Sequence, residues 1–179
     1  SNLRVLRMLA EVYVEFFRGT PLLVQIFLFY FALPVITGQR IDPFIAAISA
    51  CGINSGAYVA ETFRSAVAAI PRGQFEAAAT LNFTRMQTLR HVVIPQAVRI
   101  ALPNLGNNFI DLIKGTSLVS VISMVDLFQT GKQIASRTFE PLAMYSEVAV
   151  IYLVIFTLLT AAQSALEKYS NRYVRSNNA

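Results

Sequence analysis

The chain is poor in the residue types on which soluble enzymes depend. Its 179 residues include one cysteine, one histidine and no tryptophan, and only 14% are charged. The single cysteine, Cys51, excludes a disulfide framework and any multi-cysteine metal site. Soluble domains carry roughly a quarter charged residues. The low charge, together with 55% hydrophobic residues, therefore predicts an all-α membrane protein.

The placement of the basic residues argues against nucleic acid as a partner. The formal net charge is +5, but Lys and Arg flank apolar stretches instead of forming a patch of their own. This is the positive-inside pattern of a protein in a lipid bilayer. It predicts that both ends of the chain and the loop near its middle are cytoplasmic. The residues concerned are Arg4, Arg7, Arg18, Arg64, Arg72, Arg85, Arg90, Arg99, Lys168, Arg172 and Arg175.

About four apolar stretches are predicted to form transmembrane helices, because about 20 mostly apolar residues span a bilayer. Thr20-Pro21 and Asp42-Pro43 are cap and first-turn pairs that predict where the first two helices begin. Gly52 and Gly56 form a GxxxG pattern, which lets helices approach closely. We expect one membrane domain over residues 1–179. The four stretches are residues 22–36, 42–69, 100–128 and 143–166.

A polar, basic loop separates the second stretch from the third. Residues 76–95 read EAAATLNFTRMQTLRHVVIP. Alanine is the best helix former, so residues 74–81 are predicted to be a short helix. Glu76 is expected in its first turn, where a carboxylate suits the helix dipole. Asn82 is expected to end this helix in a left-handed conformation.

A second short helix is predicted after the bend. Thr84 and Gln87 have the spacing of a capping box. Pro95 is expected to end the helix, because proline lacks the N–H that a helix interior requires. The loop is therefore predicted to be a helix, a bend and a second helix on the cytoplasmic side.

This loop, about residues 73–95, resembles the loop through which permease subunits of bacterial ABC importers contact their ATPase. The family pattern is Glu-Ala-Ala, three residues, Gly, nine residues, Ile, one residue, Leu-Pro. Asn82 stands where the family has Gly. The residues that match or conservatively replace the pattern are Glu76, Ala77, Ala78, Val92, Ile94 and Pro95.

Taken alone, the loop has two interpretations. It could be an ordinary cytoplasmic hairpin that is basic because of the positive-inside rule. The resemblance instead implies a coupling helix that docks into a groove of an ATPase subunit. The residues to which it assigns this contact are Glu76, Ala77, Ala78, Asn82, Arg85 and Arg90.

Further blocks along the chain resemble permeases of the polar-amino-acid branch of binding-protein-dependent ABC importers. They are YVEFFRGTP at 13–21, INSGAY at 53–58, ALPNLGNNFI at 101–110, KGTSLVSVI at 114–122 and IASRTFEP at 134–141. The resemblance implies the type I importer permease fold. Family members usually have one more transmembrane helix before the RGTP block. We therefore expect this chain to lack the first family helix.

The resemblance also implies a function and a set of partners. The chain would import a polar amino acid across the bacterial cytoplasmic (inner) membrane. It would pair with a second copy or a close relative, with ABC ATPase subunits and with an extracytoplasmic solute-binding protein. Which amino acid is carried, and whether the pair is a homodimer or a heterodimer, stay open.

The chain itself is predicted to be non-catalytic and to bind no cofactor. A Walker A motif is missing, because Gln133 follows Gly131-Lys132 and Asp126 stands at the required upstream Gly. ATP and Mg²⁺ would therefore be bound by the partner ATPase. The single histidine, His91, has no carboxylate or serine partner at a useful spacing. We expect neither catalysis nor a metal site.

Ionisable and amide groups inside the apolar stretches are candidates for lining a substrate pathway, because each is costly in lipid. Asp111 and Lys114 could instead form a structural ion pair. Asn54 could instead hydrogen-bond the backbone of a neighbouring helix. The candidates are Asn54, Tyr58 and Glu61 on one face of the second stretch, Asp111, Lys114 and Ser117 on the third, and Glu147 on the last.

Three other classes of function compete with an ATP-coupled permease, and one of them, a structural scaffold, is compatible with the composition alone. An ATP-independent channel or secondary transporter for small zwitterions would need only the polar stripes, but it leaves the loop at residues 73–95 unexplained. A membrane-embedded enzyme would need paired carboxylates, an activated nucleophile or a metal cluster, and the sequence offers none of these patterns.

Overall fold

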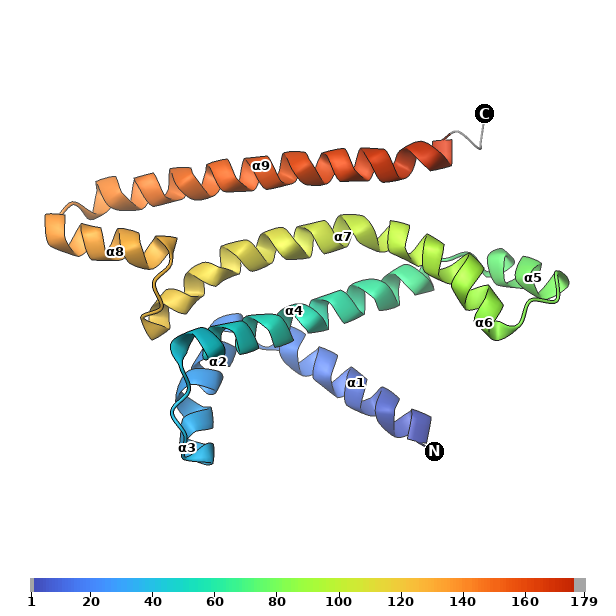
Figure 1. Ribbon diagram of the computed structural model, residues 1–179, viewed down its shortest axis with the longest axis horizontal. Helices are drawn as coiled ribbons and strands as arrows, with labels where there is room; N and C mark the ends of the chain where they lie inside the picture. The colour runs from blue at the N-terminus through green and yellow to red at the C-terminus, as the bar shows by residue number, and fades with distance from the viewer. Residues whose placement is uncertain (1, 176–179) are drawn as a thin grey trace.

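A computed structural model of the chain describes residues 2–175, and it describes side chains over residues 4–168. Within these residues every regular element is a helix, as the composition predicted. Figure 1 shows the helices running mostly along the long axis of the molecule. The hydrophobic core is therefore made where helices cross, without a sheet.

The chain begins with two helical segments that meet at a sharp bend. Helix α1 (Asn2–Gly19) is followed by α2 (Leu22–Phe27), η1 (Leu28–Ala32) and α3 (Leu33–Thr37). The second segment is bent by 106° relative to α1. The expected cap at Thr20 is wrong, because Pro21 is the N-cap residue of α2. The Thr20 hydroxyl donates to the Phe16 carbonyl at 2.8 Å and so belongs to the end of α1.

Helix α4 (Pro43–Ala68) is the central element of the fold. It begins as predicted, with the Asp42 carboxylate accepting a hydrogen bond from the Phe44 N–H at 2.8 Å. Its buried face consists mostly of alanine, which lets neighbouring helices approach closely. Cys51 is buried in the same cluster and is a packing residue. The cluster also contains Ile26, Ala46, Ala47, Ala50, Val119 and Ile122.

A long helical run leads back from the loop toward the other end of the molecule. Helix α5 (Arg72–Thr80) is followed by α6 (Arg85–Thr88), η2 (Leu89–Val93) and α7 (Ile94–Gly115). The prediction that Pro95 ends a helix is wrong, because Pro95 lies in the first turn of α7. The π-helical geometry of η2 just before it is a local adjustment of the kind that accommodates a proline.

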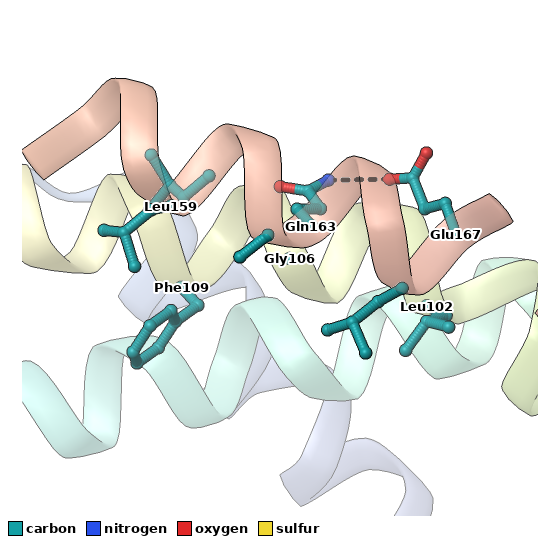
Figure 2. Close-up of a pocket in the computed structure, with 9 residues that line it drawn as sticks. Leu102, Gly106, Phe109, Leu159, Gln163 and Glu167 are labelled. Carbon is teal, nitrogen blue, oxygen red and sulfur yellow. Dashed lines mark hydrogen bonds between the residues drawn. The ribbon is translucent and has the colours of Figure 1, made fainter. Parts of the chain in front are cut away.

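The last elements lie at the far end and along one side. They are the 3₁₀ segment η3 (Thr116–Ile122), α8 (Leu127–Thr138) and α9 (Pro141–Arg175). Gln163 of α9 packs over Gly106 of α7 (Figure 2), where an added Cβ would lie 2.5 Å from the Gln163 Cδ. The Gln163 Nε2 donates to the Pro103 carbonyl at 3.0 Å. This contact ties α9 to the middle of α7.

By length and composition alone, fewer helices qualify as membrane spans than the about four that the sequence predicted. Among the described residues, two helices are long and apolar enough to cross a membrane, residues 43–68 and 141–168. They become three if α1 and the segment 22–37 form one broken span. Helix α7, over most of the third stretch, does not qualify because polar residues interrupt it. These are Arg99, Asn104, Asn107, Asn108, Asp111 and Lys114.

The predicted orientation requires the start of α1, the α5–α6 loop and the end of α9 to lie on one side of the membrane. In Figure 1 the start of α1, the α5–α6 loop and the C-terminal end of α9 lie toward one end of the long axis. Helices α3 and α8 lie toward the other end. Which of these ends faces the cytoplasm stays a prediction.

Replacing Gly56 with alanine is expected to destabilise the protein by about 1–2 kcal/mol. An added Cβ would lie 2.7 Å from the Tyr13 hydroxyl, which donates to the Ile53 carbonyl at 2.6 Å. Gly52→Ala is the matched control, since its Cβ would meet nothing within 4 Å. It should stabilise the helix by about 0.5–1 kcal/mol. Thermal unfolding in detergent compares them, and equal shifts would contradict this packing of α1 on α4.

Candidate functional site

The first candidate site is the hairpin formed by α5 and α6. Helix α5 ends as predicted, with Asn82 in the left-handed conformation at φ 53°. The Phe83 N–H donates to the Ala78 carbonyl and the Asn82 N–H to the Ala79 carbonyl, both at 3.0 Å. These two bonds form a Schellman motif. Glu76 lies in the second turn because α5 begins at Arg72, so its predicted place in the first turn is wrong.

The start of α6 is fixed by side chains. The Gln87 N–H donates to the Thr84 hydroxyl at 3.3 Å, and the Thr84 N–H donates to the Gln87 Oε1 at 2.8 Å. This confirms the predicted capping box. Hydrogen bonds therefore fix both the end of α5 and the start of α6, and they define the shape of the hairpin between them.

The surface of the hairpin carries the predicted coupling residues. Ala78 is only 2% exposed, and it supports the hairpin from inside. The exposed members of the predicted set are Glu76, Ala77, Asn82, Arg85 and Arg90. Large apolar side chains are exposed among them, which is typical of a surface that binds another protein. They are Phe75, Leu81, Phe83, Met86 and Leu89.

The hairpin is anchored to the two helices from which it emerges. A buried cluster joins the end of α4 to the start of the helical run into α7. It consists of Ala66, Ile70, Val93, Ala97 and Ala101. The Gln96 side chain also donates to the Gln74 side chain at 3.0 Å, which links α7 to α5. The hairpin is therefore attached to α4 and α7 together.

The second candidate site is a cavity of about 220 Å³ between α2, α4 and α7, here called the α4–α7 pocket. It brings together three of the predicted pathway residues, Asn54, Tyr58 and Asp111. Two further polar residues, Ser55 and Asn108, also line it and were not predicted from the sequence. Asn108 lies three residues before Asp111 on α7, so helical spacing from that residue could have found it. The lining residues are Leu22, Asn54, Ser55, Tyr58, Asn108, Asp111 and Leu112.

Asn54, at the edge of this pocket, has a structural role as a hydrogen-bond donor. Its amide N–H groups reach the Phe17 carbonyl and the Gln25 Oε1, each at 3.0 Å. Gln25 in turn donates to the Phe17 carbonyl at 2.9 Å and to the Thr20 hydroxyl at 2.8 Å. The interpretation of Asn54 as a hydrogen-bond partner of a neighbouring helix backbone is therefore confirmed.

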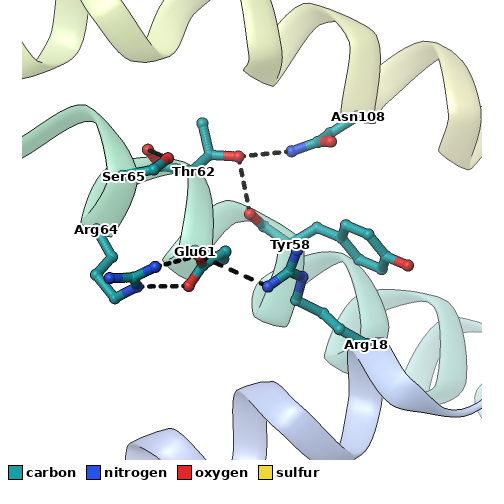
Figure 3. A network of polar contacts seen from close by, with 7 residues as sticks. All are labelled: Arg18, Tyr58, Glu61, Thr62, Arg64, Ser65 and Asn108. Carbon is teal, nitrogen blue, oxygen red and sulfur yellow. Dashed lines mark hydrogen bonds and ion pairs between the residues drawn. The ribbon is translucent and has the colours of Figure 1, made fainter. Parts of the chain in front are cut away.

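Glu61 lies outside the pocket, in a polar network on the other side of Tyr58. Figure 3 shows its carboxylate between Arg64 and Arg18. Arg64 donates to it twice, at 2.6 and 2.7 Å. The Arg18 guanidinium is 3.7 Å away and also lies 5.5 Å from the centroid of the Tyr58 ring. No sequence pattern placed Arg18 beside Tyr58, because the two lie on different helices.

The remaining pathway candidates are dispersed. Lys114 is 3.9 Å from the Asp111 carboxylate, and its ammonium lies 4.1 Å from the centroid of the Phe156 ring. Ser117 of η3 donates to the carbonyl of Lys114 of α7 at 2.8 Å, so its hydroxyl is used where these two segments meet. Glu147 is exposed on α9 and does not line the pocket.

The α4–α7 pocket has the chemistry of a binding site for a small polar molecule. Its aspartate offers a negative charge, and its amide and hydroxyl groups can both donate and accept hydrogen bonds. Over the part of the chain that the structure describes, no three His, Cys, Asp or Glu side chains come together to hold a metal ion.

Apolar helices, a polar pocket among α2, α4 and α7, and a hydrogen-bonded hairpin at the ends of α4 and α7 define a class of protein, the transport permease. The chain belongs to the family described as binding-protein-dependent transport system inner membrane component, which matches residues 1–171. These permeases are membrane subunits of ABC importers, so the resemblance drawn from the sequence is confirmed.

Named relatives and solved structures agree with the family. The L-cystine transport system permease protein TcyB of Bacillus subtilis is 42% identical over 97% of this chain and 74% of its own length. The glutamine transport system permease protein GlnP of Escherichia coli K12 is 45% identical over 89% of this chain and 73% of its own. The chain thus spans about three quarters of these relatives.

Two solved structures share the fold. The crystal structure of an amino acid ABC transporter with histidines has a TM-score of 0.89 at 40% identity, covering 94% of this chain and 78% of that one. An inward-facing structure of the MetNI methionine ABC transporter has a TM-score of 0.77 at 22% identity, covering 95% and 77%. The type I importer permease fold is therefore confirmed.

Asn82→Gly should leave the hairpin intact, whereas Asn82→Val should loosen it. Glycine adopts positive φ freely, but a side chain branched at Cβ is strained there by about 1–2 kcal/mol. Hydrogen–deuterium exchange at residues 81–84 should accelerate roughly tenfold in Asn82→Val, since 1.4 kcal/mol corresponds to a factor of ten. Equal exchange in the two variants would show that the hairpin does not depend on this residue.

Proposed function

We propose that this chain, as a single transmembrane permease domain, forms a translocation pathway for a polar amino acid and couples it to ATP hydrolysis by a separate ATPase subunit. One observation carries the proposal. The rigid, partly apolar hairpin is attached to the same two helices, α4 and α7, that form the polar pocket. The amino-acid transport named for the relatives and for one solved structure supports the substrate class.

The hairpin would work as the coupling contact. Its exposed apolar side chains would enter a groove on the ATPase, with Glu76, Arg85 and Arg90 at the polar rim. Closure of the ATPase pair around ATP and Mg²⁺ would displace the hairpin. Because α4 and α7 are packed together at that end, both would tilt as one body and change the shape of the α4–α7 pocket.

The pocket would hold the substrate during this change. The Asp111 carboxylate suits the ammonium group of an amino acid. The amide of Asn108 and the hydroxyls of Ser55 and Tyr58 are donors for its carboxylate. Lys114, whose ammonium lies 3.9 Å from the Asp111 carboxylate, would help to hold that carboxylate in place. These interactions suit zwitterions in general and leave the side chain of the substrate open.

The same proposal implies the other subunits of the transporter. A second copy or a close relative would complete the pathway, and a solute-binding protein would deliver the substrate from outside. Arg72, Arg85 and Arg90 on the hairpin favour its placement in the cytoplasm by the positive-inside rule. The start of α1 and the end of α9 lie toward the same end of the molecule (Figure 1) and would also be cytoplasmic.

An ATP-independent channel or secondary transporter for small zwitterions is the competing function. The α4–α7 pocket alone would be sufficient for it. The capped hairpin with exposed apolar side chains would then have no role. Uptake into proteoliposomes that contain the complex, with and without enclosed ATP, separates the two functions.

Glu76→Lys is expected to reduce ATP-driven uptake roughly tenfold or more and to uncouple ATP hydrolysis from substrate. Reversing this charge would add a cation to the proposed ATPase contact, which already carries Arg85 and Arg90, and a charge mismatch of this kind at an interface costs several kcal/mol. Glu140→Lys is the matched control, because Glu140 is exposed in the short connection after α8, and α8 lies toward the opposite end of the molecule from the hairpin (Figure 1). Uptake that needs no ATP and is unchanged in Glu76→Lys would contradict coupling through the hairpin.

Asp111→Asn is expected to lower uptake at least tenfold while the complex still assembles. The change removes the negative charge of the pocket and keeps its shape, so the ammonium group loses a charged partner worth about 1.4 kcal/mol or more. Glu147→Gln removes a charge from α9 outside the pocket and should retain uptake. Equal losses in both variants, or a loss explained by a lower Tm of Asp111→Asn, would reject Asp111 as a substrate contact.

A further inference from the structure

A second cavity lies beside the α4–α7 pocket, between α1 and α4. It is an open groove of about 710 Å³, here called the α1–α4 groove. Most of its lining side chains are ionised, and those on α1 recur every three or four residues and so share one face of the helix. The lining residues are Arg7, Ala10, Glu11, Val14, Glu15 and Arg18 on α1, and Ala60, Glu61 and Arg64 on α4.

The opposite face of α1 is apolar and turns away from the protein. Its large side chains are about half exposed. Helix α1 therefore directs its charges toward α4 and its apolar side outward, the reverse of an amphipathic helix on a soluble protein. In a membrane, ionised side chains face a wet cavity or the protein interior. The exposed apolar residues are Val5, Leu9, Val12 and Phe16.

The charges in the groove balance one another. Three arginines and three glutamates line it. Arg7 pairs with Glu11 at 2.8 Å, and Arg64 pairs with Glu61 at 2.6 Å. A surface of mixed and balanced charge attracts water without holding a cation, an anion or a zwitterion strongly, because neither sign dominates.

Tyr58 stands between the groove and the pocket. It lines the α4–α7 pocket, and the Arg18 guanidinium over its ring lines the α1–α4 groove (Figure 3). Thr62 accepts a hydrogen bond from Asn108 at 3.0 Å and donates to the Tyr58 carbonyl at 2.9 Å, which ties this turn of α4 to α7. Arg18 is held more loosely, because its contact to Glu61 is 3.7 Å long.

We propose that the α1–α4 groove is the water-filled cytoplasmic vestibule of the transport path, and that Tyr58 with Arg18 is the partition between it and the α4–α7 pocket. The proposal rests on the proposed function, because it takes the pocket as the substrate site and the hairpin end as cytoplasmic. A zwitterion released from the pocket would pass Tyr58 when Arg18 moves off its ring. It would then leave along the charged face of α1.

The accessibility of introduced cysteines tests the vestibule. In a Cys51→Ser background, the full complex with its ATPase carries either Ala60→Cys in the groove or Leu9→Cys on the apolar face of α1. Both positions are exposed in this chain, so exposure alone predicts equal reactivity. A charged, membrane-impermeant methanethiosulfonate added on the ATPase side should modify Ala60→Cys roughly tenfold faster, because a thiolate forms readily only in water.

The opposite result overturns the vestibule. Ala60→Cys that reacts no faster than Leu9→Cys would mean that lipid or a second copy of the chain fills the groove. Wild-type uptake, measured in the same preparation, separates this outcome from a failure of the proposed function. If wild-type uptake is ATP-driven and Ala60→Cys is unreactive, the vestibule alone is rejected.

Paired substitutions of Tyr58 test the partition. Tyr58→Ala removes the ring and should allow an amino acid to leak down its gradient without ATP, at least several-fold above wild type. Tyr58→Phe keeps the ring under Arg18 and should not leak. Tyr58→Ala liposomes that are as tight as wild type, with the complex intact by gel filtration, would overturn the partition and leave ATP coupling untouched.

Discussion

The bend between α1 and α2 depends on a few side-chain hydrogen bonds, and the rest of the structure depends on that bend. Backbone groups freed at a helix break cannot be satisfied by lipid, and each one left unpaired costs several kcal/mol. Gln25, only 1% exposed, and Asn54 satisfy them by donating to the Phe17 and Thr20 carbonyls. Without these bonds α1 could not turn by 106° into α2 and still lie along α4, and the α1–α4 groove would not exist.

The same requirement divides the polar residues of the spans into two groups. Asn54 and Ser117 direct their hydrogen atoms to backbone carbonyls, as does Gln163 beside Pro103. Asn54 and Gln163 satisfy backbone groups beside a bend and a proline, and Ser117 does so where α7 passes into η3. Asp111 and Tyr58 line a cavity and are not used in this way. A polar residue in a span is therefore a candidate for function only after the backbone around it has been accounted for.

What the sequence predicted correctly was local. The Asp42 cap, the left-handed Asn82 and the capping box at Thr84 each depend on residues no more than five positions apart. The errors at Thr20 and Pro95 came from neighbours that override local preference: Thr20 is held by α1, and η2 accommodates Pro95. Of the polar residues that line the pocket, Asn54, Tyr58 and Asp111 were among the predicted candidates, and Ser55 and Asn108 were not. Helical spacing shows which residues share a face of one helix, but not which helices face each other. The family could be identified from the sequence because several sequence segments typical of it occur in the right order over nearly the whole chain, and such a series is specific.

Helix α4 connects the proposed parts of the transport cycle. Its end carries the hairpin, one side lines the α4–α7 pocket, and the adjacent side lines the α1–α4 groove. Asn54, near its middle, is bonded to the bend, so in the proposed cycle it would act as a pivot when the hairpin end moves. Tyr58 and Glu61 lie one and two turns beyond this pivot, on the hairpin side. A tilt of α4 would therefore move Tyr58 relative to Arg18, whose helix is held at the bend, and open the partition from the same displacement that reshapes the pocket.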